Sequence, residues 1–432
     1  MATISVPGGS FSSAFGADSI TVSTVDNATF QNALVSLFNS GFNATSTVVV
    51  NDPNAPSSVL GAAGNVLVNN AAGAITLASG FNGLANEVTS GSVTVTGNSG
   101  TNESIVSAGG NFTFYSQPSE SGTLIGAGGN TLFTGPTSGG GNWVVDLTGS
   151  SGANTIVGGS DSLMVQDGTG QTNVMYLGSG ADSIGVFGTD TLVGQSGNDT
   201  VWLNSGGNLV YGGSGTTVLV DQPSVSGSTD TSSTFVGGSG DATIYAMGGS
   251  TGTYDIGSGS MTLVGASGSD PTIGGSYNAA NPSASAVVFA TGGSNVTFNS
   301  GTDGNVLVAA GANATLNASG SDGANVLFNE AGAGNAATLM GGSYYNYFIA
   351  GTGNATMAGG SGPNFFQFFS TSDGGSNLIT GWNNANDQID LNGYTSYNET
   401  VSGGSTVITL SDNTKITVQN VTNLNPNDIK VS

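Results

Sequence analysis

The chain has 432 residues, of which 74 are glycine, 26 are acidic, two are lysine and none is arginine, histidine or cysteine. A net charge of −24 argues against nucleic acids and anionic lipids as partners, because there is no cationic surface to neutralise their phosphates. Without histidine and cysteine the chain lacks disulfides, thiol nucleophiles, the commonest general base and the commonest transition-metal ligand.

Glycine at this level often accompanies disorder. Here 37% of the residues are hydrophobic and only 6% are charged, which is the reverse of a typical disordered composition. Glycine is therefore interpreted as the turn residue that reaches positive φ, and the abundant Thr, Val, Ser and Asn as the contents of many short strands. No run of 18 apolar residues occurs, so we expect no membrane insertion, and residues 1–9 show no Sec-type signal.

Residues 1–110 are predicted to form an N-terminal cap and the first β coils. Within this segment, apolar side chains recur at helical spacing at Phe30, Leu34, Leu37 and Phe38. This spacing predicts a short amphipathic helix near 27–42. Because a stack of β coils exposes raw sheet edges at its ends, the helix is interpreted as a cap over one edge rather than as a docking helix.

A short pattern dominates residues 111–377: a small residue, then Asn or Asp, then two or three mostly apolar residues. In the second half the Asn are separated by 10, 8, 12, 10, 11, 8, 10 and 13 residues and stand at Asn295, Asn305, Asn313, Asn325, Asn335, Asn346, Asn354, Asn364 and Asn377. A period of about ten suits neither a heptad nor a helical repeat, and it is too short for a propeller blade. It predicts an all-β, parallel β-solenoid in which two patterns make one coil of roughly 18–20 residues.

Three aspartates stand in the most regular copies of the pattern. They are Asp182 in Gly-Ser-Gly-Ala-Asp-Ser-Ile, Asp190 in Gly-Thr-Asp-Thr-Leu and Asp199 in Gly-Gln-Ser-Gly-Asn-Asp-Thr-Val. These segments resemble the nonapeptide repeats of the RTX proteins, whose pattern is G-G-x-G-x-D-x-U-x. Asp241 stands in a fourth, degenerate copy. The resemblance covers about two thirds of the chain loosely and about residues 178–202 tightly.

The last segment also resembles the RTX proteins. Asp387 and Asp390 stand in Asp-Gln-Ile-Asp-Leu. This is similar to a motif of RTX C-termini, where a strand pair and a final small domain follow that a type I secretion machine reads. Residues 378–432, with their alternating strands and both lysines, are therefore expected to form a β-rich C-terminal cap and secretion-signal region. The resemblance implies a secreted protein that is extracellular or lies on the cell surface.

In RTX repeats, aspartate carboxylates and turn carbonyls from adjacent coils bind calcium, a hard ion that takes six to eight oxygens. The resemblance makes calcium the expected cofactor, with candidate ligands at Asp182, Asp190, Asp199, Asp241, Asp387 and Asp390. An ordinary turn role is the alternative for Asp182, Asp190 and Asp199, and capping of the fold is the first interpretation for Asp387 and Asp390. Most positions of the pattern carry Asn, which brings one neutral oxygen. Calcium is expected to be weak or absent there, and the amides are expected to hydrogen-bond from coil to coil as ladders.

No catalytic residue is predicted, because hydrolytic triads need a base and only carboxylates and two lysines remain. A carboxylate pair of the glycosidase kind stays open in principle. We predict that the chain is no enzyme but a secreted structural protein that self-assembles, with calcium assisting, as a surface layer, an extracellular filament or a biofilm matrix. A solenoid can also stack end to end, and head-to-tail contacts generate fibres.

The alternative function is an adhesin that binds carbohydrate or another surface, and a secreted enzyme is the third. Adhesion to carbohydrate needs exposed aromatic side chains, for which the candidates are Trp143, Trp202, Phe365, Phe366 and residues 344–347. A place in the core or the cap is the first interpretation for these residues. The expected partners are further copies of the chain and cell-surface polysaccharide.

Overall fold

The structure, a computed structural model, describes residues 2–5, 19–22, 48–51, 66–77, 81–222, 233–274, 286–298, 305–309, 311–372 and 374–432. The predicted capping helix near 27–42 lies outside these residues. Two compact units divide the chain, residues 1–216 (unit 1) and 217–432 (unit 2). The predicted segments 1–110, 111–377 and 378–432 do not coincide with these units and stay a prediction. Among the described residues, no helix has the length and hydropathy needed to cross a membrane.

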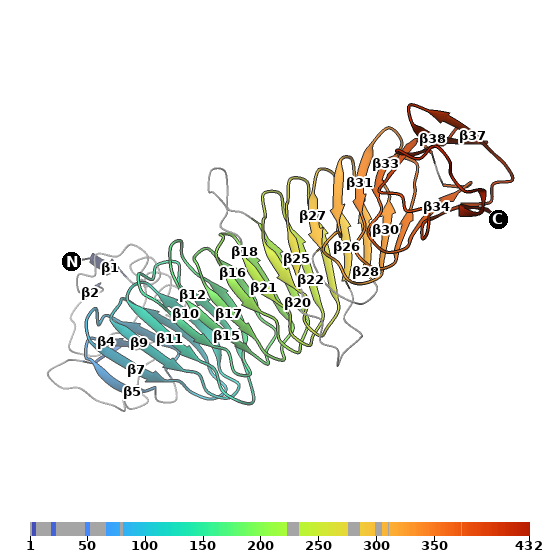
Figure 1. Ribbon diagram of the computed structural model, residues 1–432. Coiled ribbons are helices and arrows are strands. Elements are labelled where there is room, and N and C mark those ends of the chain that lie inside the picture. Colours follow the sequence, from blue (N-terminus) through green and yellow to red (C-terminus); the bar gives the residue numbers. More distant parts are fainter. Residues whose placement is uncertain are drawn as a thin grey trace. The chain divides into compact units, whose positions relative to one another are not determined.

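Unit 1 is a parallel β-solenoid in which the chain alternates between two sheets, called here the even sheet and the odd sheet (Figure 1). A separate antiparallel pair is formed by β1 (Ala2–Ser5) and β2 (Ser19–Val22). The even sheet contains β3 (Val48–Asn51), β4 (Val66–Asn69), β6 (Gly83–Asn86), β8 (Asn102–Ser107), β10 (Ser121–Gly126), β12 (Asn142–Asp146), β14 (Ser162–Gln166), β16 (Ser183–Val186) and β18 (Asp199–Leu203). The odd sheet contains β5 (Gly73–Thr76), β7 (Ser92–Thr96), β9 (Asn111–Tyr115), β11 (Asn130–Thr134), β13 (Thr155–Val157), β15 (Val174–Gly178), β17 (Thr191–Gly194) and β19 (Leu209–Tyr211).

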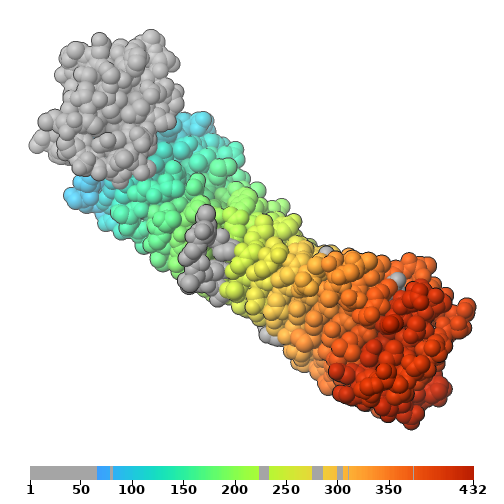
Figure 2. Space-filling view, turned by 90° about the horizontal axis from the view of Figure 1, so that it is seen from above, coloured from blue at the N-terminus to red at the C-terminus, as the bar shows by residue number. Residues whose placement is uncertain are grey.

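Unit 2 repeats the same alternation. Its even sheet contains β20 (Thr217–Asp221), β22 (Ala242–Ala246), β24 (Met261–Gly265), β26 (Ala286–Ala290), β28 (Asn305–Ala309), β30 (Asn325–Asn329), β32 (Asn346–Ile349), β34 (Asn364–Phe369), β36 (Gln388–Asn392) and β40 (Ile429–Val431). Its odd sheet contains β21 (Thr234–Val236), β23 (Thr253–Asp255), β25 (Thr272–Gly274), β27 (Asn295–Phe298), β29 (Ala314–Asn317), β31 (Ala336–Met340), β33 (Asn354–Ala358), β35 (Ser376–Thr380) and β39 (Lys415–Val418). Within each unit, successive coils contribute successive bands of surface (Figure 2).

The coils stack in register because each strand places alternate side chains into the core. In β20 to β34, for example, one inward residue from every even strand is fully buried, at Leu219, Ile244, Leu263, Val288, Leu307, Leu327, Phe348 and Phe366. These residues pair strand by strand in the parallel ladder. The predicted parallel β-solenoid is confirmed, with its core between the two sheets.

The C-terminal segment begins as one more coil of the even sheet. In β36, Ile389 and Leu391 are fully buried, and the strand pairs in parallel with both β34 and β40. An antiparallel sheet then follows, in which β37 (Tyr397–Ser402) pairs with β38 (Ser405–Leu410), and β38 pairs with β39. The 3-10 helix η1 (Pro426–Asp428) precedes β40. The motif from Asp387 to Leu391 is therefore a core strand of the solenoid, while its part in secretion stays a prediction.

An aromatic cluster fills the core of unit 1 where the two sheets meet. The ring of Trp143 lies 5.0 Å from that of Phe114 and 5.5 Å from that of Phe133, measured between centroids. Its indole Nε1–H donates to Ser116 Oγ at 3.0 Å, which satisfies the one polar atom of the side chain. Trp143 is thus a core residue and not an adhesin contact, and the same holds for the fully buried Phe366.

Replacement of Trp143 by alanine should therefore lower the free energy of unfolding by about 3–5 kcal/mol, because a large cavity forms and Ser116 loses its donor. Urea unfolding followed by circular dichroism measures this loss. Trp202→Ala is the matched control, since 37% of the Trp202 side chain is exposed and its loss should cost less than about 1 kcal/mol. Equal losses in the two variants would contradict this description of the core.

Candidate functional site

Three aspartates form a ladder in the turns that precede even strands of unit 1. Asp161 and Asp182 directly precede β14 and β16, Asp199 begins β18, and each is at most 3% exposed. One oxygen of each carboxylate accepts a backbone N–H from the coil before it: Gly141 N at 2.7 Å, Leu163 N at 2.7 Å and Asp182 N at 3.3 Å, respectively. The ladder thus ties successive coils together along one corner of the solenoid.

In two of these three aspartates, the second carboxylate oxygen lacks a hydrogen-bond partner. Oδ2 of Asp161 and Oδ2 of Asp182 are buried without a hydrogen-bond partner. Burial raises the pKa of all three carboxyls, to about 7 for Asp182, where the charges of Asp199 and Asp161 add to the effect, and to about 6 for Asp199. A buried carboxylate that only accepts hydrogen bonds needs a proton or a cation on its free oxygen.

Asp190 lies at the opposite corner, in the turns that precede odd strands. Its Oδ1 accepts the backbone N–H of Asn173, and its own N–H donates to Asn208 Oδ1 at 2.8 Å. Asn154 continues this row, since its Nδ2 donates to Asn173 Oδ1 at 2.9 Å. Burial, followed by the neighbouring carboxylate of Asp167, raises the pKa of Asp190 to about 8. The three predicted aspartates therefore belong to two corners, with Asp182 and Asp199 together and Asp190 apart.

In unit 2 the same even-strand position carries amides. Asn325 Nδ2 donates to Asn346 Oδ1 at 3.1 Å, Asn346 Nδ2 to Asn364 Oδ1 at 2.9 Å, and Asn364 Nδ2 to Asp387 Oδ1 at 2.8 Å. Asp387 also accepts the N–H of Asn383 through Oδ2 at 2.8 Å. The expected amide ladder is confirmed. Because an amide both donates and accepts, every rung is satisfied without an ion, and Asp387 serves as the terminal acceptor.

The remaining predicted ligands lie elsewhere. Asp241 is exposed and accepts the N–H of Ser260 at 3.0 Å. Asp390 is half-buried and points outward from β36, where it accepts from the Gln388 side chain. Nowhere in the described part of the chain do three or more acidic side chains converge on one point. Calcium ligation by each of the six predicted aspartates stays a prediction.

Sequence reasoning missed a buried pair of glutamates in unit 1. Glu103 and Glu120 are at most 1% exposed, and both accept the backbone N–H of Asn98, at 3.2 and 3.0 Å. Burial and the adjacent Glu103 raise the pKa of Glu120 to about 9. Glu120 occupies the turn position just before β10, as Asp161 does before β14. A search of the pattern for Glu as well as Asn and Asp would have found it.

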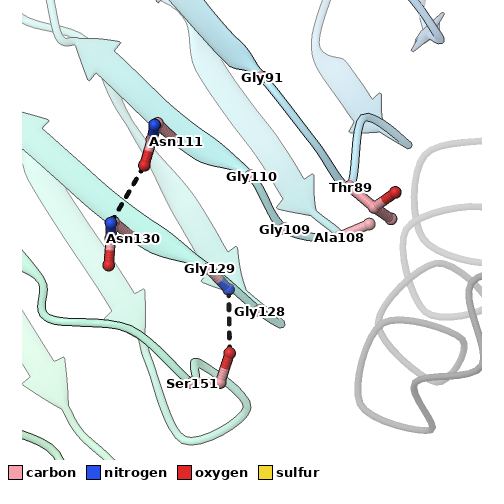
Figure 3. A pocket seen from close by; sticks show the side chains of 10 residues that line it. All are labelled: Thr89, Gly91, Ala108, Gly109, Gly110, Asn111, Gly128, Gly129, Asn130 and Ser151. Carbon is pink, nitrogen blue, oxygen red and sulfur yellow. Dashed lines mark hydrogen bonds between the residues drawn. The ribbon is translucent and has the colours of Figure 1, made fainter.

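The corners themselves are built from glycine turns. Figure 3 shows such a corner in unit 1, at the turns that precede odd strands. A hollow of about 520 Å³ there is lined by Gly109, Gly110, Gly128 and Gly129 among others. Gly129 has φ +63°, and a Cβ there would lie 2.0 Å from the Gly110 carbonyl oxygen. Beside it, Asn130 Nδ2 donates to Asn111 Oδ1 at 3.0 Å. Neighbouring coils can approach this closely only because no side chain stands between their backbones.

Replacement of Gly129 by alanine should lower the free energy of unfolding by more than about 2 kcal/mol, because the new Cβ meets a backbone carbonyl and the φ is unfavourable. Thermal unfolding monitored by circular dichroism measures the loss. In Gly185→Ala, on β16, the nearest atoms to the new Cβ lie 3.8 Å away, so the change should stay within about 1 kcal/mol. Wild-type stability in Gly129→Ala would refute the close approach of the coils.

A family model for the RTX calcium-binding nonapeptide repeat, in four copies, matches residues 146–162, 184–219 and 332–366. The chain contains RTX-type nonapeptide repeats. The first two RTX matches include Asp161, Asp190 and Asp199, and Asp182 lies just before the second. The third RTX match covers Asn346 and Asn364 of the amide ladder. A comparison with curated proteins finds no match to this chain.

The RTX repeat is a calcium-binding motif, and the aspartate ladder of unit 1 fits this ion. Asp161 and Asp182 each hold a buried, unpartnered carboxylate oxygen. A Cβ on Gly197 would lie 1.8 Å from the Gly180 carbonyl oxygen and 3.1 Å from Asp199 Oδ1, so carbonyl and carboxylate oxygens crowd together here. A hard cation with several oxygen ligands suits such a site. Calcium held by these residues would supply the positive charge that the buried carboxylates lack.

Proposed function

We propose that this RTX-type solenoid is an extracellular structural protein that self-assembles, with calcium assisting, into a surface layer, a filament or a biofilm matrix. The observation that carries the proposal is the ladder Asp161–Asp182–Asp199, whose buried oxygens need a cation in a chain that holds only two lysines. RTX repeat proteins are typically secreted, and free calcium is abundant outside cells. The ladder would then be completed only after export.

The repulsion between copies supports a role for calcium in assembly. With 26 acidic residues against two lysines, two copies repel each other at neutral pH, and the repulsion is strongest at low ionic strength. Calcium can neutralise carboxylates within a coil and bridge exposed ones between copies. A structural role also agrees with the solenoid itself, whose turn aspartates are engaged in coil-to-coil hydrogen bonds rather than in an open cleft.

Electron microscopy of the purified chain tests this function. We expect ordered fibres or sheets with calcium in several-fold excess over the chain, and isolated particles after chelation with EGTA. Magnesium at the same concentration controls for simple charge screening. Isolated particles under all three conditions would contradict self-assembly.

An adhesin is the second candidate, and one surface cluster favours it. Tyr344 and Tyr345 are 50% and 38% exposed, and their rings lie 4.6 Å apart. Tyr345 also stacks with Phe365 at 6.3 Å and an interplanar angle of 20°. Exposed aromatic faces of this kind can pack on sugar rings. A glycan array with wild type and Tyr344→Ala would separate the two candidates, since a structural subunit gives no signal that depends on Tyr344.

A further inference from the structure

The even sheet of unit 2 is apolar on its outer side. Its outward side chains form two columns that run in register from β20 to β34. The first column is Val218, Thr243, Thr262, Val287, Val306, Val326, Tyr347 and Phe365, and the second is Val220, Tyr245, Val264, Phe289, Val308, Phe328, Ile349 and Gln367. We call these sixteen side chains the unit-2 outer face. It contains no carboxylate and no lysine.

These strands are therefore apolar on both sides, since their inward column is fully buried. Near-continuous apolar strands are typical of sheets that are covered on both faces, whereas a sheet with one face in water alternates apolar and polar residues. Most side chains of the unit-2 outer face are partly exposed, and Tyr245 is 39% exposed. The apolar outward residues therefore indicate that another molecule covers this face when the protein functions.

The odd sheet of the same unit, by contrast, has polar residues on its outer side. Its outward positions include a register-matched row of threonines at Thr234, Thr253, Thr272 and Thr297. A second row follows at Thr315, Thr338 and Thr356. The two sheets have the same coils and the same strand spacing. The apolar character of the unit-2 outer face is thus specific to one side and does not follow from the overall composition.

We propose that the unit-2 outer face is the surface on which this chain self-associates, and that its occupant is the same face of a second copy. The inference rests on the proposed function and names the contact that it needs. Charge favours this occupant, because copies that carry 26 acidic residues and two lysines repel each other least where carboxylates are absent. A basic partner would instead be drawn to the carboxylates elsewhere. A glycan would find few hydrogen-bonding groups among these valines and phenylalanines.

The dimensions of the face also suit a second copy. Eight strands about 4.8 Å apart, each about 17 Å long, give roughly 600 Å² for each copy and about 1,200 Å² in total, which is the lower limit of specific interfaces. An identical face has the same strand spacing, so the side chains of two copies can interdigitate row by row. Beside the last rows lies a hollow of about 450 Å³ lined by Phe328, Ile349 and Phe369 among others, which deepens the contact surface.

Sedimentation velocity over a concentration series tests this surface with the double variant Val264→Lys/Phe328→Lys. Two buried charges in each copy should raise the dissociation constant of self-association by about 100-fold or more. Thr338→Lys/Thr356→Lys, on the outer side of the odd sheet, adds the same charges and should leave the constant within about threefold of wild type. Equal effects of both double variants would overturn the proposal.

A second measurement does not depend on how well the lysine variants fold. The chain has no cysteine, so Val287→Cys places a single thiol near the middle of the unit-2 outer face, and Thr338→Cys places one on the odd sheet. Mild oxidation should form an interchain disulfide rapidly in the first variant and at least about tenfold more slowly in the second. This contrast follows from the proximity of the thiols in a face-to-face pair.

These experiments distinguish a failure of the proposed contact surface from a failure of the proposed function. Fibres or sheets that persist in Val264→Lys/Phe328→Lys, without a faster disulfide in Val287→Cys, would overturn the surface and leave self-assembly standing. A wild-type chain that stays monomeric with calcium would contradict both. Binding of the monomeric wild type to phosphatidylcholine vesicles, lost in the lysine variant, would show that lipid covers the face and would also overturn the proposal.

Discussion

The double variant Asp182→Asn/Asp199→Asn is expected to lose most of the stabilisation that calcium gives to the wild type. An ion that binds only the folded chain stabilises it by about 2.7 kcal/mol at a hundred times its dissociation constant. In the variant, each buried carboxylate becomes a neutral amide with a single oxygen, so the gain at the same calcium concentration should fall below about 1 kcal/mol. Urea unfolding in calcium and in EGTA measures both values.

The same variant should be more stable than the wild type in EGTA at pH 8. The free oxygen Oδ2 of Asp182 is replaced by an N–H donor, which removes a buried charge. The new donor can pair with a backbone carbonyl of its own turn, as Nδ2 of Asn346 does with Gly342 O and Nδ2 of Asn364 with Gly360 O. Asp146→Asn, on the outer side of β12, is the matched control and should keep the full calcium response. A double variant with an undiminished calcium response would exclude the aspartate ladder as the calcium site.

The second large effect is a pH dependence that is opposite to the usual one. Burial raises the pKa of Asp199 to about 6, of Asp182 to about 7, of Asp190 to about 8 and of Glu120 to about 9. In the unfolded chain these groups titrate near pH 4. Between pH 4 and pH 9 the folded, calcium-free chain therefore holds more protons than the unfolded chain, and its stability must fall as the pH rises.

For Asp182 alone, this loss between about pH 4 and pH 7 is on the order of 4 kcal/mol. Urea unfolding in EGTA at pH 5 and pH 8 should thus give a clearly higher stability at pH 5. With saturating calcium the difference should shrink or reverse, because calcium binds the deprotonated carboxylates. A calcium-free chain that is most stable near neutral pH would contradict the raised pKa of these buried carboxyls.

The solenoid could be predicted from the sequence because its signal is local. Each turn needs a residue that tolerates a tight backbone, followed by a short alternating strand, and this requirement recurs along the whole chain in segments such as Asn325–Asn329 and Asn364–Phe369. Stacking then places equivalent residues of successive coils side by side. For this reason the amide ladder of Asn325, Asn346 and Asn364 could also be expected from spacing alone.

The grouping of the aspartates could not be predicted in the same way. Asp182, Asp190 and Asp199 lie eight and nine residues apart along the chain, but each coil has two corners, so every second position belongs to the same ladder. The sequence period does not say which corner a position occupies when turn lengths vary. Spacing alone therefore does not group Asp161 with Asp182, although β14 and β16 are neighbouring strands and the charge of Asp161 adds to the raised pKa of Asp182.

The apolar outer face of unit 2 escaped sequence reasoning for a related reason. A strand such as Val-Leu-Phe in β30 reads as a core segment whichever way it faces, and only the register shows that Val326 and Phe328 point outward while Leu327 is buried. The Glu103–Glu120 pair escaped because glutamate was not considered as a turn residue. Both features depend on pairing between coils, which a single sequence does not display.

The most direct test of calcium at the aspartate ladder is a crystal structure of the chain grown with calcium, with anomalous data to locate the ions. We expect anomalous peaks at the turns that hold Asp161, Asp182 and Asp199, and none along the Asn325–Asn346–Asn364 ladder. Peaks confined to the amide ladder or to the molecular surface, with the buried carboxylates of unit 1 left without ions, would contradict it.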